Sequence, residues 1–332
     1  MVNKIKKTWK YIHEFNLICF ITNLLSTIIP YKNKGNRFAW FLLQKKHNSI
    51  LRYLSRYYYK AVKEDIHFFA SDTEKYDRCI WTAWFQGEEN APEVIQLTLA
   101  SIRKNANKHN VIVLTDENIH RYIDIPALIH KKYIDGTIAK AAYADIIRLM
   151  ILARYGGIWV DATILMNSPF NETSYNMPFF SVGVDDDNSP FVSSNRWIAG
   201  IIGSKNNSKY SYILSKMFNS YWIDHDEYID YFIIDYMITL LYNHDEDFKA
   251  IVDTFSKMKY HTNELRKVMN AGATASCFIN EKFNDIEEQI SKKGDYKVNA
   301  VFMGDRKDNP FYNNIDKYDQ NSVIALKNLT QY

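Results

Sequence analysis

Cysteine is scarce in this chain of 332 residues: Cys19, Cys79 and Cys277 are scattered, odd in number and without C-x-x-C spacing. This pattern predicts neither a disulfide framework nor a zinc site, and it is typical of a reducing compartment. The nine histidines form no H-E-x-x-H pattern, and the G-x-S-x-G and G-K-[ST] motifs are also absent from the sequence. These absences argue against the hydrolase and kinase classes.

Acidic residues are nearly absent from the first 63 residues. Glu14 stands there against 13 Lys and Arg residues, so this region carries a net charge of +12 and the rest of the chain −9. The apolar run Phe15–Ile29 lies between lysines, contains five Asn, Ser and Thr residues, and is shorter than the roughly 20 residues that a membrane-spanning helix needs. No small-residue cleavage site follows at residues 28–31, so we expect no export.

A second basic stretch, Phe38–Lys63, interleaves cations with Trp40, Tyr53 and Tyr57–Tyr59. Such helices favour the headgroup region of a bilayer, where each cation near an anionic leaflet contributes about 1 kcal/mol. We therefore expect residues 1–76 to attach a cytoplasmic protein peripherally to the inner face of the plasma membrane, with an anionic surface as partner. Alternatively, these helices pack on a catalytic domain and their basic faces are solvated. Nucleic-acid binding is disfavoured because no recognised module surrounds them.

The rest of the chain has the composition of an enzyme-sized globular protein, with 47% hydrophobic and 15% aromatic residues overall. No internal repeat or low-complexity linker interrupts it, and its start is a diffuse boundary between residues 64 and 77. Strand and helix patterns then alternate, which predicts an α/β domain over residues 77–332 with a largely parallel sheet and a helical C-terminal part. We expect strands at 79–86, 110–115, 158–160, 179–184 and 196–204, and helices at 93–106, 125–133, 210–222, 227–243 and 246–258.

The segment Ala139–Met166 carries the most specific pattern. Asp145 and Arg148 are three residues apart and therefore share one face of a predicted helix. Gly156 and Gly157 then allow the backbone to leave the helix, and the apolar residues 158–160 predict a covered strand. Open α/β sheets bind ligands at the carboxyl ends of their strands, so Asp161 is placed where a ligand would lie. A surface ion pair and a loop cap would be the structural alternative for these three residues.

This segment resembles the signature of glycosyltransferase family 32, in which a D-x-x-R helix precedes Y-G-G-I-[YW]-x-D-x-[DT]. It is most similar to the bacterial capsular polysaccharide synthesis branch, where D-A-T replaces the D-x-D of the yeast-type mannosyltransferases and the clostridial glucosylating toxins. Further similarity in Ile80–Asn90 and Val111–Asn118 extends the resemblance to roughly residues 79–240.

The resemblance implies a nucleotide-sugar-binding domain of the GT-A type and a retaining transferase. We expect it to move a hexose, with galactose or glucose favoured, from a UDP-sugar to a lipid-linked oligosaccharide of a capsular or other surface polysaccharide. A protein or teichoic acid acceptor is an alternative. An inactive sugar-nucleotide-binding scaffold is another, because Thr163 occupies the position of the second acid of D-x-D.

The resemblance also implies a set of site residues. Asp145 would hold hydroxyls of the transferred sugar, Asp161 would contact the ribose or sugar of the donor, and Arg148 is the fixed cation for the departing diphosphate. Mn²⁺ or Mg²⁺ would be held by Asp161 and Thr163, although a neutral hydroxyl is a weaker ligand than an acid. The full expected donor site comprises Trp84, Gln86, Thr115, Tyr143, Asp145, Arg148, Gly157, Asp161 and Ala162.

Several assignments stay open from the sequence. Trp84 is favoured over Trp81 for stacking on uracil, and either tryptophan could instead be a core residue. Thr115, Asp116 and Asn118 could hold the nucleoside or merely start a helix that Asp116 caps.

Asp185–Asp187 could form a second metal or acceptor site, but three acids beside Asn and Pro favour a solvated turn. Asp230 and Asp235 lie on a helix that otherwise looks buried, so one of them could take an acceptor or donor role. His261, Asn270 and Thr274 could approach the donor, although nothing in their spacing requires it.

Overall fold

The computed structural model of the chain describes residues 15, 17–28, 37–63, 76, 78–91, 93–164, 166, 169–184, 189–256 and 259–260. The N-terminal part contains α2 (Leu17–Ile28), α3 (Arg37–Leu54), a π-helical turn η1 (Ser55–Tyr59) and α4 (Lys60–Lys63). The middle part contains β1 (Ile80–Ala83), η3 (Glu88–Asn90), α5 (Glu93–Lys104), β2 (Val111–Leu114), η4 (Ile119–Arg121), α6 (Ala127–Ile134), α7 (Lys140–Tyr155) and β3 (Gly157–Val160). The described chain continues with α8 (Glu172–Asn176), β4 (Gly183–Val184), β5 (Ile201–Ser204), α9 (Lys209–Asp224), α10 (Ile233–His244), α11 (Glu246–Phe255) and β6 (Lys259–Tyr260).

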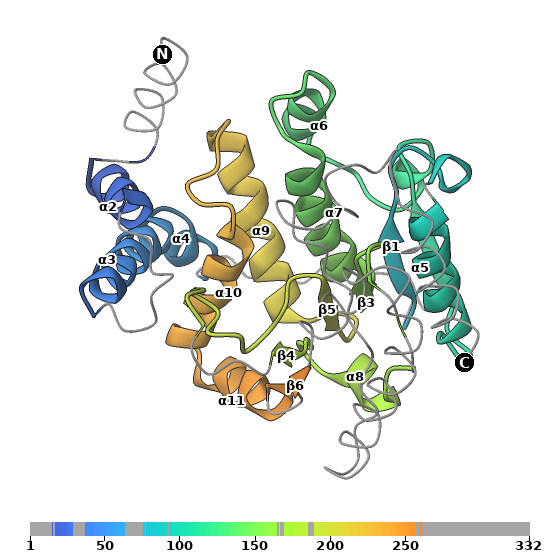
Figure 1. The fold of residues 1–332 in the computed structure, drawn as a ribbon. Helices are drawn as coiled ribbons and strands as arrows, with labels where there is room; N and C mark the ends of the chain where they lie inside the picture. The colour runs from blue at the N-terminus through green and yellow to red at the C-terminus, as the bar shows by residue number, and fades with distance from the viewer. Residues whose placement is uncertain are drawn as a thin grey trace, which may run out of the picture.

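A four-stranded sheet with the order β2-β1-β3-β5 forms the centre of the fold. Strand β1 pairs in parallel with β2 and β3, whereas β5 pairs antiparallel with β3. Figure 1 shows this sheet between α5 and the pair α7 and α9. Because helices cover the sheet, β3 is buried along its whole length, as its unbroken apolar sequence requires. The predicted α/β class with a largely parallel sheet is confirmed.

Two glycines end α7 and begin β3 as the sequence predicts. Gly156 and Gly157 have φ angles of +72° and +88°, a region that favours glycine. A Cβ atom on Gly157 would lie 2.3 Å from the carbonyl oxygen of Cys79, and one on Gly156 would lie 2.5 Å from the backbone nitrogen of Asn206. The pair therefore lets the chain reverse direction against two neighbouring backbones and aims β3 at the edge of the sheet where Asp161 follows.

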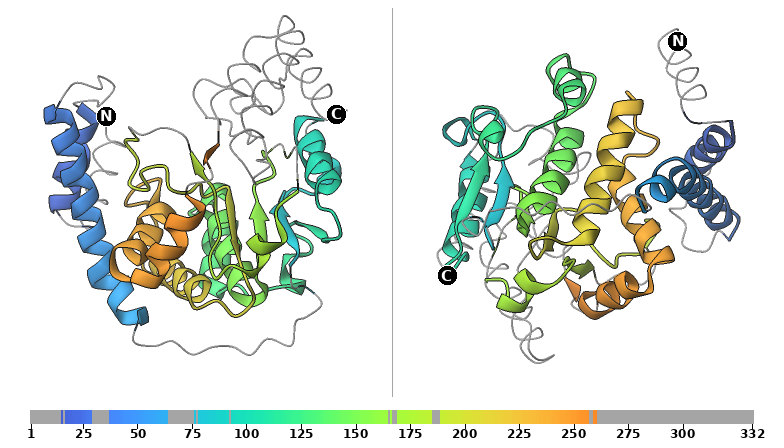
Figure 2. Two further views of the ribbon diagram at one scale, coloured as in Figure 1. Left: turned by 90° about the horizontal axis from the view of Figure 1, so that it is seen from below. Right: turned by 180° about the vertical axis from the view of Figure 1, so that it is seen from behind.

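The N-terminal helices pack on the outer side of α9 and α10, away from the sheet (Figures 1 and 2). His47 of α3 is buried, and its two ring nitrogens lie 2.7 Å from the Tyr236 hydroxyl and 3.0 Å from the Pro190 carbonyl oxygen. A carbonyl only accepts, so Nε2 of His47 carries the proton and Nδ1 accepts from Tyr236. Lys46 forms a 2.7 Å ion pair with Asp230. These contacts join α3 to the sheet-bearing part of the molecule, as the packing alternative for residues 1–76 expects.

Helix α2 turns its apolar side to solvent. Its Thr22 hydroxyl lies 2.8 Å from the Ser49 hydroxyl of α3, and Cys19 is buried in the same contact region. The opposite side is exposed by 37–67% at Leu17, Ile18, Ile21, Leu24 and Leu25. Within the part of the chain that the structure describes, no helix has both the length and the apolar character required to cross a bilayer.

Several predicted boundaries were wrong. The segment 196–204 forms a strand only from Ile201, and 179–184 forms an isolated bridge at Phe180 and the two-residue β4. Helix α10 begins at Ile233 rather than residue 227, because the Asp230 carboxylate accepts a hydrogen bond from the Phe232 amide and forms a turn there. Asp116 caps no helix: η4 begins after Asn118. The boundary at residues 64–77 lies mostly outside the described residues.

Candidate active site

The candidate site lies where β1 and β3 end. Asp161 directly follows β3, and Trp84 directly follows the parallel neighbour β1. The loop before β5 closes on the same edge, since the Asp161 amide donates to the Gly200 carbonyl oxygen over 2.8 Å. Parallel strands thus bring residues 77 positions apart in the sequence to one edge, which is where open α/β sheets bind ligands.

Arg148 is the centre of this site. Its guanidinium is buried, with 3% of the side chain exposed, and donates from Nη2 to Oδ1 of Asp161 over 2.6 Å. Nη1 lies 3.2 Å from Oδ1 of Asp145 and also donates to the carbonyl oxygen of Ala199. The predicted Asp145–Arg148–Asp161 cluster therefore forms. One planar cation fixes the positions of two carboxylates and of the loop before β5, a geometry for which the guanidinium fork is suited.

Trp159 completes the support of Asp161. Its indole Nε1 donates to the same Oδ1 of Asp161 over 2.7 Å, and the Arg148 guanidinium lies 5.2 Å from the centre of the indole ring. Alternate residues of a strand point to the same side, so the Trp159–Asp161 contact follows from their separation of two. With Oδ1 occupied by two donors, the carboxylate is held rigidly, while a third of the Asp161 side chain remains exposed toward solvent.

Burial changes the acid–base behaviour of Asp145. Desolvation raises the pKa of its carboxyl to about 6, the nearby Arg148 cation opposes this rise, and the negative charge of Asp161 adds to it. Asp145 is accordingly ionised at neutral pH but becomes neutral in mild acid. In its ionised form it accepts hydrogen bonds only, which is the property required of a group that holds sugar hydroxyls.

Asp235 of α10 belongs to the same electrostatic neighbourhood. It is buried, and its Oδ1 accepts a 2.7 Å hydrogen bond from the indole nitrogen of Trp197. Burial raises the pKa of Asp235 to about 7, the Trp197 bond opposes the rise, and the charge of Asp145 adds to it. Asp230, the other open candidate on this segment, instead pairs with Lys46 and serves the docking of α3.

The aromatic residues expected at the donor site are separated into core and edge positions. Trp81 is fully buried, donates from its indole to the Gly156 carbonyl oxygen over 3.0 Å and stacks on Tyr155, so it is a core residue. Trp84 is half-buried, and its indole nitrogen has no hydrogen-bond partner among the described residues. Tyr143 is buried and stacks on Tyr133 with ring centres 3.8 Å apart. The arrangement leaves Trp84 as the tryptophan at the strand end.

Residues of the second strand end mostly contact one another. The Asn118 side chain accepts from the Thr115 amide over 3.0 Å and donates to the Val113 carbonyl oxygen over 2.9 Å. The Asp116 carboxylate accepts from the Tyr133 hydroxyl at 3.1 Å. The side chain of Gln86 is exposed in the turn after β1. Asn118 and Asp116 are thus committed to the local fold, and a ligand role for Thr115 stays a prediction.

The remaining predicted residues frame Asp161. Ala162 is buried, and its carbonyl oxygen accepts a 2.5 Å hydrogen bond from Thr98 of α5. Thr163 is half-exposed in the turn that follows. Gly157 lies at the opposite end of β3 from Asp161, in contact with the Cys79 backbone. Asp185–Asp187, His261, Asn270 and Thr274 lie outside the described residues.

The metal expectation rests on two oxygen donors. Asp161 offers its second carboxylate oxygen and Thr163 its hydroxyl, whereas Mg²⁺ takes six ligands. Among the described residues, no group of three or more His, Cys, Asp and Glu side chains could hold a metal ion. These two residues therefore fit a divalent cation only if the donor diphosphate and water supply most of its ligands.

Three contributors to the site were missed from the sequence: the Ala199 carbonyl, Trp197 and the indole nitrogen of Trp159. The Trp159 contact has a local signal, because the residue lies two before Asp161 in a strand. Ala199 and Trp197 carry no such signal, because the β3–β5 pairing and the position of α10 bring them to the site.

Comparison with known proteins gives the family. Residues 32–315 match the family described as "Capsular polysaccharide synthesis protein", and the chain belongs to it. A segment of 124 residues is 24% identical to the O-glycosyltransferase braB of Annulohypoxylon truncatum, covering 35% of this chain and 28% of that protein. The chain thus spans less than a third of the length of this curated relative. No solved structure matches the chain.

Proposed function

We propose that this protein is a retaining glycosyltransferase that moves a hexose, with glucose or galactose favoured, from a UDP-sugar to a lipid-linked oligosaccharide during surface polysaccharide synthesis. The observation that carries the proposal is the Asp145–Arg148–Asp161 cluster at the carboxyl end of β3. Membership of the capsular polysaccharide synthesis family and the similarity to an O-glycosyltransferase support it.

In this proposal the two carboxylates hold the donor and Arg148 holds the carboxylates. Asp145 accepts hydrogen bonds from hydroxyls of the transferred sugar, and the exposed part of Asp161 contacts the donor ribose or sugar. Arg148 lies behind both acids, with little of its surface exposed. Its charge opposes the rise in the pKa of Asp145, its ion pairs hold both acids in place, and its field favours the negative diphosphate as that group departs.

The reaction breaks the bond between the anomeric carbon and the diphosphate oxygen. A hydroxyl oxygen of the acceptor forms the new bond on the same face of the sugar, and the proton of that hydroxyl passes to the departing phosphate oxygen. Retention by this route needs no strong general base, and we assign none. Trp84, at the end of β1, would stack on the uracil ring, a contact worth about 1–3 kcal/mol. Asp161 and Thr163 would hold a divalent cation, which would neutralise charge on the leaving group.

The acceptor proposal requires the protein to work at a membrane. The exposed apolar side of α2 supports peripheral attachment there, since five large aliphatic side chains face solvent without a charged residue among them. Apolar faces of this kind bury in the boundary between headgroups and acyl chains. We place the protein at the inner face of the plasma membrane on this basis.

The testing experiment measures UDP release from a panel of UDP-sugars, with and without Mn²⁺, for the wild type, Asp161→Ala and Thr163→Ala. We expect turnover of one donor in the wild type and a loss of at least a hundredfold in Asp161→Ala, because a preorganised polar contact of this kind contributes 10²–10³ in rate. Lys205→Ala, at an exposed position, is the matched control.

The outcomes separate the two functional classes. Turnover that requires Mn²⁺ and falls in Thr163→Ala would support a metal held at the D-A-T segment. Donor binding without turnover under any metal would reject the enzyme and favour an inactive sugar-nucleotide-binding scaffold. Turnover that is indifferent to Asp161 would reject the assigned site.

A further inference from the structure

A line of cations runs along the exposed side of α3 and continues into α4. Lys45, Arg52, Arg56 and Lys60 are all exposed, at intervals of seven, four and four residues. Intervals of three, four and seven residues place side chains on one face of a helix. In an α-helix, side chains four residues apart are rotated slightly beyond one full turn, so a row of them winds slowly around the axis. The π-helical turn η1, between Arg52 and Lys60, has more residues per turn and offsets this rotation. Arg52, Arg56 and Lys60 therefore remain on one face.

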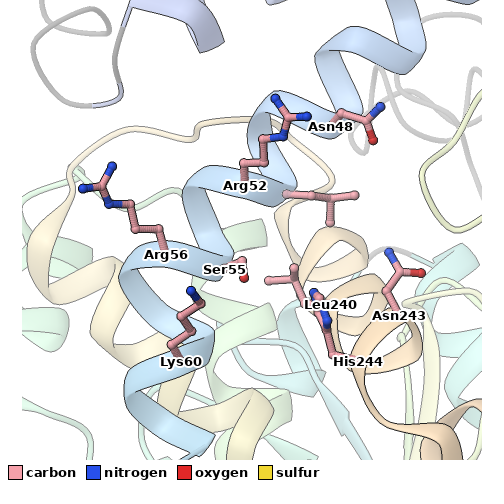
Figure 3. Close-up of a pocket in the computed structure, with 9 residues that line it drawn as sticks. Asn48, Arg52, Ser55, Arg56, Lys60, Leu240, Asn243 and His244 are labelled. Carbon is pink, nitrogen blue, oxygen red and sulfur yellow. The ribbon is translucent and has the colours of Figure 1, made fainter.

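These three cations border a surface hollow of about 750 Å³. Asn48, Leu51, Ser55 and the cations line it from the N-terminal helices, and Leu240, Asn243 and His244 line it from the end of α10, as Figure 3 shows. The hollow thus offers guanidinium, ammonium, hydroxyl and amide groups around a small apolar floor. Its volume lies in the range of small-molecule sites and accommodates a phosphate with the group that carries it.

No carboxylate in the described part of the chain pairs with Arg52, Arg56 or Lys60. The contrast with Lys46 on the same helix is direct, because that lysine forms a 2.7 Å ion pair with Asp230. Cations that are gathered around a hollow and have no carboxylate partner among the described residues favour an external anion. Two guanidinium groups favour phosphate in particular, since their planar N–H forks match its oxygens in pairs.

The surroundings of the hollow indicate that the phosphate is carried on a lipid. On α3, Ser49 faces α2, whereas Asn48, Leu51 and Ser55 face the hollow. The strip between them exposes Phe41, Lys45 and Arg52. Around α3, the exposed strip therefore lies between α2 and the hollow. A bilayer that takes up the apolar face of α2 would also contact the cations.

We propose that the hollow is a binding site for the phosphate group of an anionic membrane lipid, separate from the donor site. Figure 1 places α3 and α4 beyond α9 and α10 from the sheet. In this arrangement the lipid phosphate lies among Arg52, Arg56 and Lys60 while the aliphatic side chains of α2 enter the acyl region. The proposal rests on the membrane attachment in the proposed function and adds to it a defined site with a defined ligand chemistry.

The test compares vesicle binding of three proteins by co-sedimentation. The hollow variant carries Arg52→Gln, Arg56→Gln and Lys60→Gln. The control variant carries Lys131→Gln, Lys205→Gln and Lys216→Gln, which removes the same charge from exposed positions elsewhere. Vesicles consist of phosphatidylcholine alone or with a fixed fraction of phosphatidylglycerol. We expect the wild type and the control to bind the anionic vesicles, and the hollow variant to bind roughly a hundredfold more weakly, as three cations near an anionic leaflet imply.

Two further arms make the result decisive. Glycerol 3-phosphate, added at constant ionic strength, tests a soluble source of the phosphate, and the proposal expects it not to displace the protein from vesicles. Single substitutions, each expected to weaken binding about fivefold, replace the triple variant if thermal unfolding shows that it is destabilised. Equal losses in the hollow and control variants would overturn the site, because charge alone would then explain binding. Tight binding of the soluble ester without vesicles would overturn the lipid source.

The experiments can reject the membrane attachment and the lipid site separately. Wild type that does not bind anionic vesicles would overturn both the attachment and the lipid site. Wild type and hollow variant that bind equally would leave the attachment through α2 intact and overturn the hollow alone. UDP release in solution, without vesicles, tests the transferase independently of either result.

Discussion

The same residue types are used in opposite ways at the two ends of this molecule. At the candidate active site, Arg148 is buried among two carboxylates and a carbonyl, and Trp159 is 1% exposed with its indole nitrogen bonded to Asp161. On α3, Arg52 is exposed without a carboxylate partner in the described part of the chain, and Trp40 is 43% exposed. One region fixes every group in place, and the other leaves its groups open to the surroundings.

In the proposed function, this difference follows from what each region recognises. A buried charge is tolerated only when it is paired and hydrogen-bonded, so the active-site cluster has one geometry, and a donor sugar of defined stereochemistry requires one. A cation exposed to water needs no partner, because an exposed ion pair contributes little to the free energy of unfolding. A membrane surface presents no fixed geometry, so exposed cations and apolar side chains suit it better than a rigid cluster.

The largest effect is expected from Arg148→Lys, which tests whether the cluster at the candidate active site depends on its fixed geometry. Lysine keeps the charge but lacks the fork that reaches both acids and Ala199, so we expect UDP release to fall by about a thousandfold. We expect the free energy of unfolding to fall by about 3 kcal/mol, because a buried acid loses its partner. Arg154→Lys on the exposed side of α7 is the control, and its change should stay within about 0.5 kcal/mol. Steady-state kinetics and denaturant unfolding measure both effects. A fully active Arg148→Lys protein would show that the fork is dispensable.

Lowering the pH should loosen the attachment of the N-terminal helices. Burial lowers the pKa of His225, which contacts Tyr53 of α3, to about 4, and it also lowers the pKa of His47. The unfolded chain binds the proton near pH 6.5, so this stability is complete above pH 6.5 and is lost as the pH falls toward 4. For His225 the loss amounts to at most about 3 kcal/mol. Thermal unfolding across this range should show a weaker pH dependence in His225→Gln than in the exposed control His120→Gln. Equal slopes in the two variants would contradict the assignment.

Two adjacent lysines sharpen the contrast within α3. Lys46 pairs with the buried Asp230, whereas Lys45 is exposed. We expect Lys46→Met to lower the free energy of unfolding by about 2 kcal/mol, less than for a fully buried pair because Lys46 keeps some contact with water. Lys45→Met should change it by less than about 0.5 kcal/mol. A double-mutant cycle with Asp230→Asn isolates the pairing energy, and a coupling near zero would show that the ion pair does not hold α3 in place.

The smallest expected effect is a pH profile. In the proposed function Asp145 must be ionised to accept hydrogen bonds from the sugar, and burial raises its pKa to about 6. We therefore expect kcat/KM for the donor to fall about tenfold per pH unit below pH 6. Asp145→Asn should lower the rate at pH 7 and remove this acidic limb. An unchanged limb in that variant would assign the titration to another group, of which Asp235 is the first to examine.

Most of the correct predictions about the site came from residue patterns within one short segment of the sequence. The i,i+3 spacing of Asp145 and Arg148, the Gly156–Gly157 break and the apolar strand before Asp161 are all contained in one segment, and the structure confirms each. The start of α10 was misplaced because Asp230 forms a turn with its own neighbours, a competition between side chain and backbone that periodicity does not report. The Ala199 and Trp197 contributions come from distant segments, so only the pairing of β3 with β5 and the packing of α10 reveal them.

The π-helical turn at Ser55–Tyr59 has a consequence for how this chain can change length. Such a turn holds one residue more than the α-helical turn it replaces. Deleting one residue there would restore a regular helix and leave the residues after it in nearly their present directions, because the π-helical turn absorbs the rotation of about 100° that one residue adds in an α-helix. Tyr58, which donates to Asp224 of α9, lies inside the turn, whereas Lys60, which borders the hollow, directly follows it. The loss of one residue should therefore be tolerated better in this turn than elsewhere in α3, where a deletion would rotate all later residues by about 100°.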